Sequence, residues 1–126
     1  MITTSYFAQL KHIENPLSIC GRAPDWYTGP QYKMLAPKYW FFKEYKEGNI
    51  DQDKYTELFI KHVLVPLDAQ QVYNYLCAEY GRNVTLLCYE KPGDFCHRHI
   101  VANWFNNNLN IKVEELKFNK GDALWK

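Results

Sequence analysis

The segment "VTLLCYEKPGDFCHRHIVANWF", residues 84–105, decides the fold. Residues 84–89 are almost all apolar or β-branched, which is typical of a strand that is covered on both faces. The turn-forming residues "EKPGD" follow, and the apolar residues of 95–109 then recur at helical spacing, with Asp94 as the expected N-cap. The residues expected to face the core are Ile100, Val101, Trp104 and Phe105. A buried strand followed directly by a helix is the repeating unit of a parallel α/β sheet.

The remaining segments extend this alternation of strands and helices. Further strands are expected at residues 1–7, 17–20 and 111–116, the last at a sheet edge because it is charged. Helices are expected at 37–46, after a cap at Asp53, and from Asp68 with Gln71 to Gly81. The fold class predicted for residues 1–126 is therefore a small single-domain α/β protein. Its three layers are built on a mostly parallel sheet of about four strands.

Composition excludes several classes of protein. At 126 residues with 47% hydrophobic side chains, the chain has the composition of one globular domain. A net charge of +1 gives no global attraction for polymeric nucleic acid or for a membrane surface. No leader or membrane span is recognisable, so a cytoplasmic location is expected, where the four cysteines would stay reduced.

Three segments with reactive side chains are expected to meet at one edge of the sheet. Cys20-Gly21-Arg22 follows the second strand, Cys88 ends the third strand, and Cys96-His97-Arg98 begins the helix after it. Parallel sheets bind ligands beyond the carboxyl ends of their strands. This convergence predicts a ligand site at that edge.

The helix start suggests what this site could do. A helix N-terminus favours anions and lowers the pKa of a cysteine placed there, so Cys96 is the expected thiolate nucleophile and His97 its base or orienting partner. Arg98 and Arg22 carry forked donors that suit phosphate or carboxylate. The alternative is that Cys96 is simply packed and that the two basic residues are solvated.

Metal and redox chemistry are weaker alternatives. Cys88, Cys96, His97 and His99 include enough soft donors for zinc, but seven residues separate the two cysteines, more than in common structural zinc sites. Consecutive residues of a first helical turn also project in different directions. We therefore expect neither a bound metal nor another cofactor. A Cys88–Cys96 redox pair lacks the Cys-x-x-Cys spacing.

The loop at residues 21–37 carries aromatic rings beside the expected site. Trp26, Tyr27 and Tyr32 lie among two glycines and three prolines, in a loop long enough to suggest a function. Flat rings next to an anion-binding helix start would suit a nucleotide-like ligand, with Cys88 and Arg98 as further contacts. The alternative is that the rings pack the loop itself.

The chain also resembles the domain-of-unknown-function 488 family, whose members are small bacterial and phage-borne proteins. Cys88 matches the strand-end cysteine of the family, and Cys96, His97 and Arg98 match its Cys-His-Arg signature. The loop residues that match a shorter subgroup are Tyr27, Gly29, Tyr32, Leu35, Ala36 and Pro37. Cys20-Gly21-Arg22 departs from the family pattern, which leaves Cys20 without an assigned role. The resemblance implies an α/β fold and a shared pocket but supplies no reaction.

Three functions remain open from the sequence. The favoured one is recognition of a small phosphorylated or nucleotide-like ligand, with thiol chemistry at Cys96 in its enzymatic version. In the alternative, the same groups form a non-catalytic binding module, such as a phage protein that sequesters a nucleotide. A structural or interaction protein with an empty pocket is the third.

Overall fold

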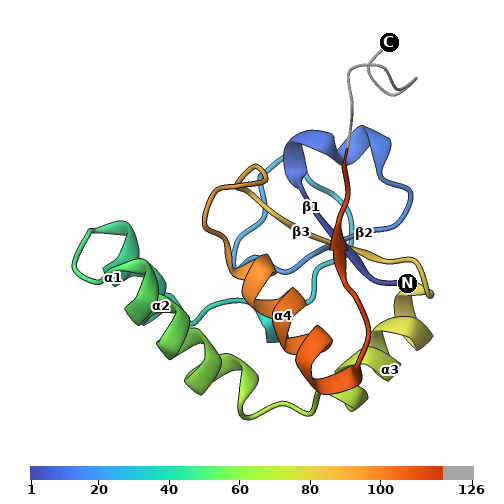
Figure 1. The fold of residues 1–126 in the computed structure, drawn as a ribbon. Coiled ribbons are helices and arrows are strands. Elements are labelled where there is room, and N and C mark those ends of the chain that lie inside the picture. Colours follow the sequence, from blue (N-terminus) through green and yellow to red (C-terminus); the bar gives the residue numbers. More distant parts are fainter. Residues whose placement is uncertain (118–126) are drawn as a thin grey trace.

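The computed structural model describes residues 1–117, and it contains one four-stranded sheet in which every pairing is parallel. The strands are β1 (Thr3–Tyr6), β2 (Pro16–Ser18), β3 (Thr85–Cys88) and β4 (Glu114–Glu115), and Figure 1 labels the first three. Their order in the sheet is β2-β3-β1-β4. All four residues of the inner strand β3 are buried, as its unbroken apolar sequence predicts. The charged strand β4 lies at an edge. The predicted α/β class and parallel sheet are thus confirmed.

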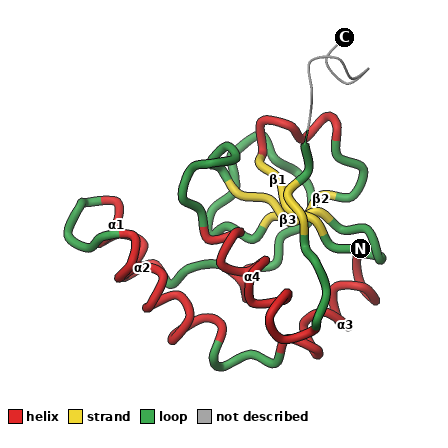
Figure 2. Tube along the Cα trace, viewed as in Figure 1, coloured by secondary structure: helices red, strands yellow, loops and turns green. Residues whose placement is uncertain are grey.

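Helices connect and cover these strands (Figure 2). The α-helices are α1 (Tyr39–Lys46), α2 (Gln52–Phe59), α3 (Ala69–Tyr80) and α4 (His97–Leu109). Shorter segments are the 3-10 helices η1 (Phe7–His12) and η2 (Lys33–Leu35), and the π-helical turn η3 (Ile60–Leu64) that extends α2. Within the described residues, every helix is too short or too polar to cross a membrane.

Three helix starts differ from the sequence-based prediction, among them α1, which begins at Tyr39 instead of Pro37, and one agrees. The α3 start agrees, because the Asp68 side chain accepts a hydrogen bond from the backbone N–H of Gln71 at 3.0 Å. Helix α2 is capped by Asp51 instead of Asp53, two residues earlier than expected. Asp94 does not cap α4, because Cys96 is its N-cap residue. The ring of Phe95 packs against Tyr45 and Tyr55, which explains why the chain enters the helix later.

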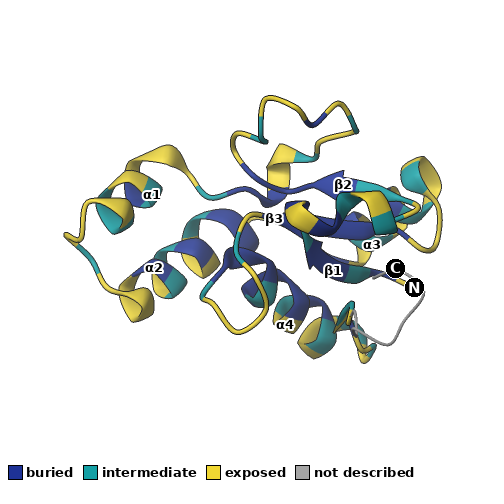
Figure 3. Ribbon diagram, turned by 90° about the horizontal axis from the view of Figure 1, so that it is seen from above, coloured by how far each residue is buried: buried dark blue, intermediate teal, exposed yellow. Residues whose placement is uncertain are grey.

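The sheet lies between two different layers. Leu86 faces the main core, which the α-helices form on one side, whereas Leu87 faces a second core on the other side. Alternation of side chains along a strand produces this division. The second core is covered by η1 and the loop that follows β2, since its members include Phe7 and Tyr27. Figure 3 shows that buried residues follow the strands and the inner side of α4, while much of α1 is exposed.

Candidate functional site

A cavity of about 730 Å³ opens where β2 and β3 end. This volume is in the range of small-molecule sites. Its wall is formed by the residues after β2, the end of β3, the first residue of α4 and one face of α1. These lining residues are Cys20, Gly21, Arg22, Pro37, Tyr39, Phe42, Lys46, Cys88, Tyr89, Glu90 and His97. The prediction of a site at the carboxyl edge of the sheet therefore coincides with the position of this cavity.

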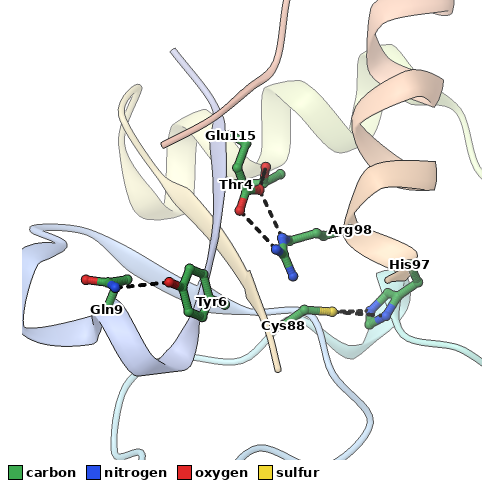
Figure 4. A network of polar contacts seen from close by, with 7 residues as sticks. All are labelled: Thr4, Tyr6, Gln9, Cys88, His97, Arg98 and Glu115. Atoms are coloured by element: carbon green, nitrogen blue, oxygen red, sulfur yellow. Dashed lines mark hydrogen bonds and ion pairs between the residues drawn. The ribbon is translucent and has the colours of Figure 1, made fainter. Parts of the chain in front are cut away.

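His97 is a buried polar side chain of the cavity wall, and both of its ring nitrogens have a partner. Its Nε2 lies 2.7 Å from the carbonyl oxygen of Ile19, so Nε2 carries the proton and donates it to this acceptor. The other ring nitrogen, Nδ1, lies 3.1 Å from Cys88 Sγ (Figure 4). In the neutral imidazole this Nδ1 is unprotonated and can accept the thiol proton. The backbone of Ile19, the residue after β2, thus orients an imidazole toward the cysteine that ends β3.

Cys20 brings a second thiol to the same place. The sulfur atoms of Cys20 and Cys88 and a ring nitrogen of His97 all lie within 4.8 Å of one another, and all three residues are buried. The two cysteines follow or end the neighbouring parallel strands β2 and β3, which explains why they meet. Two thiols and an imidazole are donors that zinc accepts. From the sequence, these three segments are expected to meet, but with Cys96 instead of Cys20 as the second thiol beside Cys88.

Cys96 does not line the cavity, although a nucleophile that attacks a bound ligand would have to. Its residue is 3% exposed and packs in the second core, and it is not among the described residues that line the cavity. Burial, followed by its interaction with Cys88, raises the pKa of the Cys96 thiol. This direction is opposite to the lowering expected from a helix N-terminus. Burial likewise raises the pKa of Cys88.

Arg98 does not line the cavity, because its side chain is buried and forms an ion pair inside the protein. Its Nε and one Nη lie 3.0 and 2.9 Å from the two carboxylate oxygens of Glu115, and Thr4 donates a further hydrogen bond to this carboxylate (Figure 4). Although burial lowers the pKa of Arg98, the hydrogen bonds to Glu115 outweigh it and raise the pKa above the ordinary value. Arg98 does bind a carboxylate, as its chemistry predicts, but that carboxylate belongs to the edge strand β4.

The cations at the cavity are Arg22 and Lys46. The Arg22 side chain is 88% exposed and lies 3.7 Å from Asp25, so it is free to reorient toward a ligand. Its carbonyl oxygen accepts a hydrogen bond from the Tyr89 hydroxyl at 2.6 Å, which ties the loop after β2 to the end of β3. The Lys46 ammonium lies 5.4 Å from the centre of the Phe42 ring.

The three rings predicted to contact a ligand pack elsewhere. Tyr27 is buried in the second core, where its hydroxyl donates to the Pro30 carbonyl and its ring contacts Phe7. Trp26 is exposed and also contacts the Phe7 ring, and Tyr32 stacks on Tyr75 of α3. These contacts agree with the alternative in which the rings pack the loop.

Other rings line the cavity instead. Tyr39 and Phe42 come from α1, and Tyr89 follows β3. Tyr39, Phe42 and Lys46 occupy positions i, i+3 and i+7 and therefore share one helix face. This spacing was the sequence signal that could have identified them.

The cavity wall also contains a polar group without a partner. Glu90 Oε2 is buried and has no hydrogen-bond partner among residues 1–117.

Comparison with known proteins identifies the family. A family model described as the active DUF488-N3 subclade matches residues 9–109, which is most of the chain. The chain belongs to the domain-of-unknown-function 488 family. The matched region contains Cys88 and Cys96-His97-Arg98, on which the resemblance was based, and the family assignment is confirmed. No curated protein and no solved structure matches the chain.

Proposed function

We propose that the cavity binds a small anionic ligand that carries a flat ring, with a nucleotide as the representative chemistry. The observation that carries this proposal is the composition of one cavity wall, in which Arg22 and Lys46 lie among Tyr39, Phe42 and Tyr89. The cations suit a phosphate or carboxylate group, and the aromatic faces suit a base. The volume of about 730 Å³ is sufficient for a ligand of this size.

The unpartnered oxygen of Glu90 further supports a polar ligand. Buried acceptors normally have a hydrogen-bond partner, and a rotation of the Glu90 side chain would turn this unpartnered oxygen toward a donor in the cavity. Glu90 lines the cavity, so a donor on the bound molecule can reach this residue. A hydroxyl of a sugar or an amino group of a base is such a donor. The proposed ligand therefore combines an anionic group, a ring and a hydrogen-bond donor.

The burial of the cysteines favours a binding module over a thiol enzyme. A nucleophilic cysteine must ionise, and burial in apolar surroundings opposes that ionisation for Cys88 and Cys96 alike. The enzymatic version is supported by the contact between Cys88 and His97 and by the word "active" in the description of the matching subclade. In that version Cys88, which lines the cavity, replaces Cys96 as the nucleophile, and Nδ1 of His97 takes its proton.

Calorimetric titration of the metal-stripped protein with adenosine monophosphate, adenosine and inorganic phosphate tests the proposal. We expect the monophosphate to bind more tightly than either fragment, because only it uses the cations and the rings together. Arg22→Ala and Lys46→Ala should each weaken its binding by about tenfold, on the order of one charged hydrogen bond. Lys43→Ala is the matched control, since Lys43 lies on α1 but is not among the described lining residues.

Two outcomes would contradict the binding proposal. One is the absence of monophosphate binding. The other is binding that Lys43→Ala weakens as much as Arg22→Ala and Lys46→Ala do. Cys88→Ser separates the two versions: unchanged affinity with no consumption of ligand supports the binding module. Consumption of the ligand by the unmodified chain, abolished by Cys88→Ser, would instead support the thiol enzyme.

A further inference from the structure

We propose that Cys20, Cys88 and His97 form a binding site for one soft divalent metal ion of the zinc class, with an open coordination position toward the cavity. This site goes beyond the proposed ligand function and does not depend on it. It also departs from the expectation of a metal-free protein. That expectation was based on the spacing of Cys88 and Cys96, whereas the second thiol of the proposed site comes from Cys20.

The distances between the donor atoms are close to those that a tetrahedral ion requires. Zinc binds sulfur at about 2.3 Å and nitrogen at about 2.0 Å, which places its donors roughly 3.5–4 Å apart. The three donor atoms lie within 4.8 Å of one another, with Cys88 Sγ 3.1 Å from His97 Nδ1. The same sulfur is 3.7 Å from Nε2, so coordination requires the ring to tilt until the Nδ1 lone pair faces the ion. These adjustments are within the range of side-chain rotation.

The outer contacts of the histidine are those of a metal ligand. A coordinating histidine usually donates its second ring N–H to a carbonyl or carboxylate, which fixes its tautomer and orientation. Here Nε2 donates to the Ile19 carbonyl at 2.7 Å, which leaves Nδ1 for the metal. Ile19 immediately precedes Cys20, so one short segment supplies both a ligand and the orienting carbonyl.

The position of the group leaves room for a fourth ligand. All three residues are buried and also line the cavity, so the side of the ion away from the protein would face that space. Three protein ligands with one open position characterise catalytic zinc sites, and two cysteines with one histidine are among the ligand sets found there. Two thiolates would balance the charge of a divalent ion in this buried location. The open position could accept the anionic group of the proposed ligand.

The test is metal binding by the full chain after removal of metals with a chelator. Titration with Co²⁺ should give one equivalent of bound ion and a thiolate-to-cobalt charge-transfer absorption band, and Zn²⁺ should displace it. Cys20→Ser should weaken Zn²⁺ binding by at least about 100-fold, more than the loss of an outer contact of a ligand. Cys88→Ser should have a similar effect. Cys77→Ser should retain the band, because Cys77 lies in α3 outside the group, and Cys96→Ser should retain it as well.

Several results would overturn the metal site. These are the absence of a thiolate band, a band that persists in Cys20→Ser, or a band that Cys96→Ser abolishes while Cys20→Ser does not. Circular dichroism and unfolding curves show whether each variant is folded, and Cys20→Ser decides the matter if Cys88→Ser does not fold. The monophosphate titration uses metal-stripped protein, so its failure would leave a positive metal result intact. Failure of the metal titration would likewise leave a positive monophosphate result intact.

Discussion

His97 and Arg98 are consecutive residues at the start of α4, yet they belong to two different regions of the molecule. His97 contacts the ends of β2 and β3 and lines the cavity. Arg98 is fully buried and forms an ion pair with Glu115 in the edge strand β4. Consecutive helical residues point about 100° apart, because an α-helix has 3.6 residues per turn. One residue can therefore reach the cavity while its neighbour holds the helix against the sheet.

This difference changes how the Cys-His-Arg motif is interpreted. Three adjacent chemically active side chains suggest a single reactive centre, but here each has different surroundings. Cys96 packs in the second core, His97 faces the cavity, and Arg98 joins α4 to β4. The motif thus combines one site residue with two residues that support the fold. Measuring stability and binding independently separates these roles.

The largest effect is expected for Arg98→Met. This change leaves the carboxylate of Glu115 without its main partner in a mostly buried position, where the side chain is 18% exposed. Loss of one partner of such an ion pair costs about 3–5 kcal/mol in the free energy of unfolding. Urea denaturation followed by circular dichroism measures this loss. The double variant with Glu115→Leu should recover most of it, and a single-variant loss below about 1 kcal/mol would contradict the structural role.

The second effect concerns the reactivity of the cysteines. Cys96 is buried, whereas Cys77 is partly exposed, so iodoacetamide should modify Cys77 faster in the native protein. We expect a difference on the order of a hundredfold, because a buried thiol reacts only after local opening. Peptide mapping by mass spectrometry gives both rates, and the denatured protein is the control in which they converge. Faster modification of native Cys96 would restore it as a candidate nucleophile.

A smaller effect is expected from Gly29→Ala. A Cβ atom at this position would lie 2.6 Å from the hydroxyl of Tyr27, so the buried Tyr27 ring would have to move. Overpacking of this kind costs about 1–3 kcal/mol in the free energy of unfolding. Gly21→Ala is the matched control, since a Cβ atom added at Gly21 would meet no other atom within 4 Å. Equal stability losses in the two variants, measured by urea denaturation, would show that the packing of Tyr27 does not matter.

The fold was largely predictable from local patterns. The unbroken apolar run of β3, the cap at Asp68 and the stop at Gly81 each depend on neighbouring residues in the sequence, and the structure places all three as expected. The start of α4 was not predictable in this way. It depends on the packing of Phe95 against rings of α1 and α2, which lie far away in the sequence.

The candidate site was predictable in its place but only partly in its residues. Topology rules located it at the carboxyl edge of the sheet, where Arg22, Cys88 and His97 line the cavity. The aromatic residues were misplaced because the side on which a long loop folds is decided by tertiary contacts, here between Tyr27 and Phe7. Cys20 was expected at this edge but had no assigned role, because its distance from the Cys88 sulfur and the His97 ring depends on tertiary packing.

The most direct test of the central claim is a map of backbone amide chemical shifts during titration with adenosine monophosphate. We predict that the perturbed amides cluster at residues 20–22, at Tyr39, Phe42 and Lys46 of α1, at residues 88–90 and at His97, which all line the cavity. Glu115 and the loop residues Trp26 and Tyr27 should remain unchanged, because they lie outside its lining. Shifts confined to Trp26 and Tyr27 or to β4, or no shifts at all, would contradict the account.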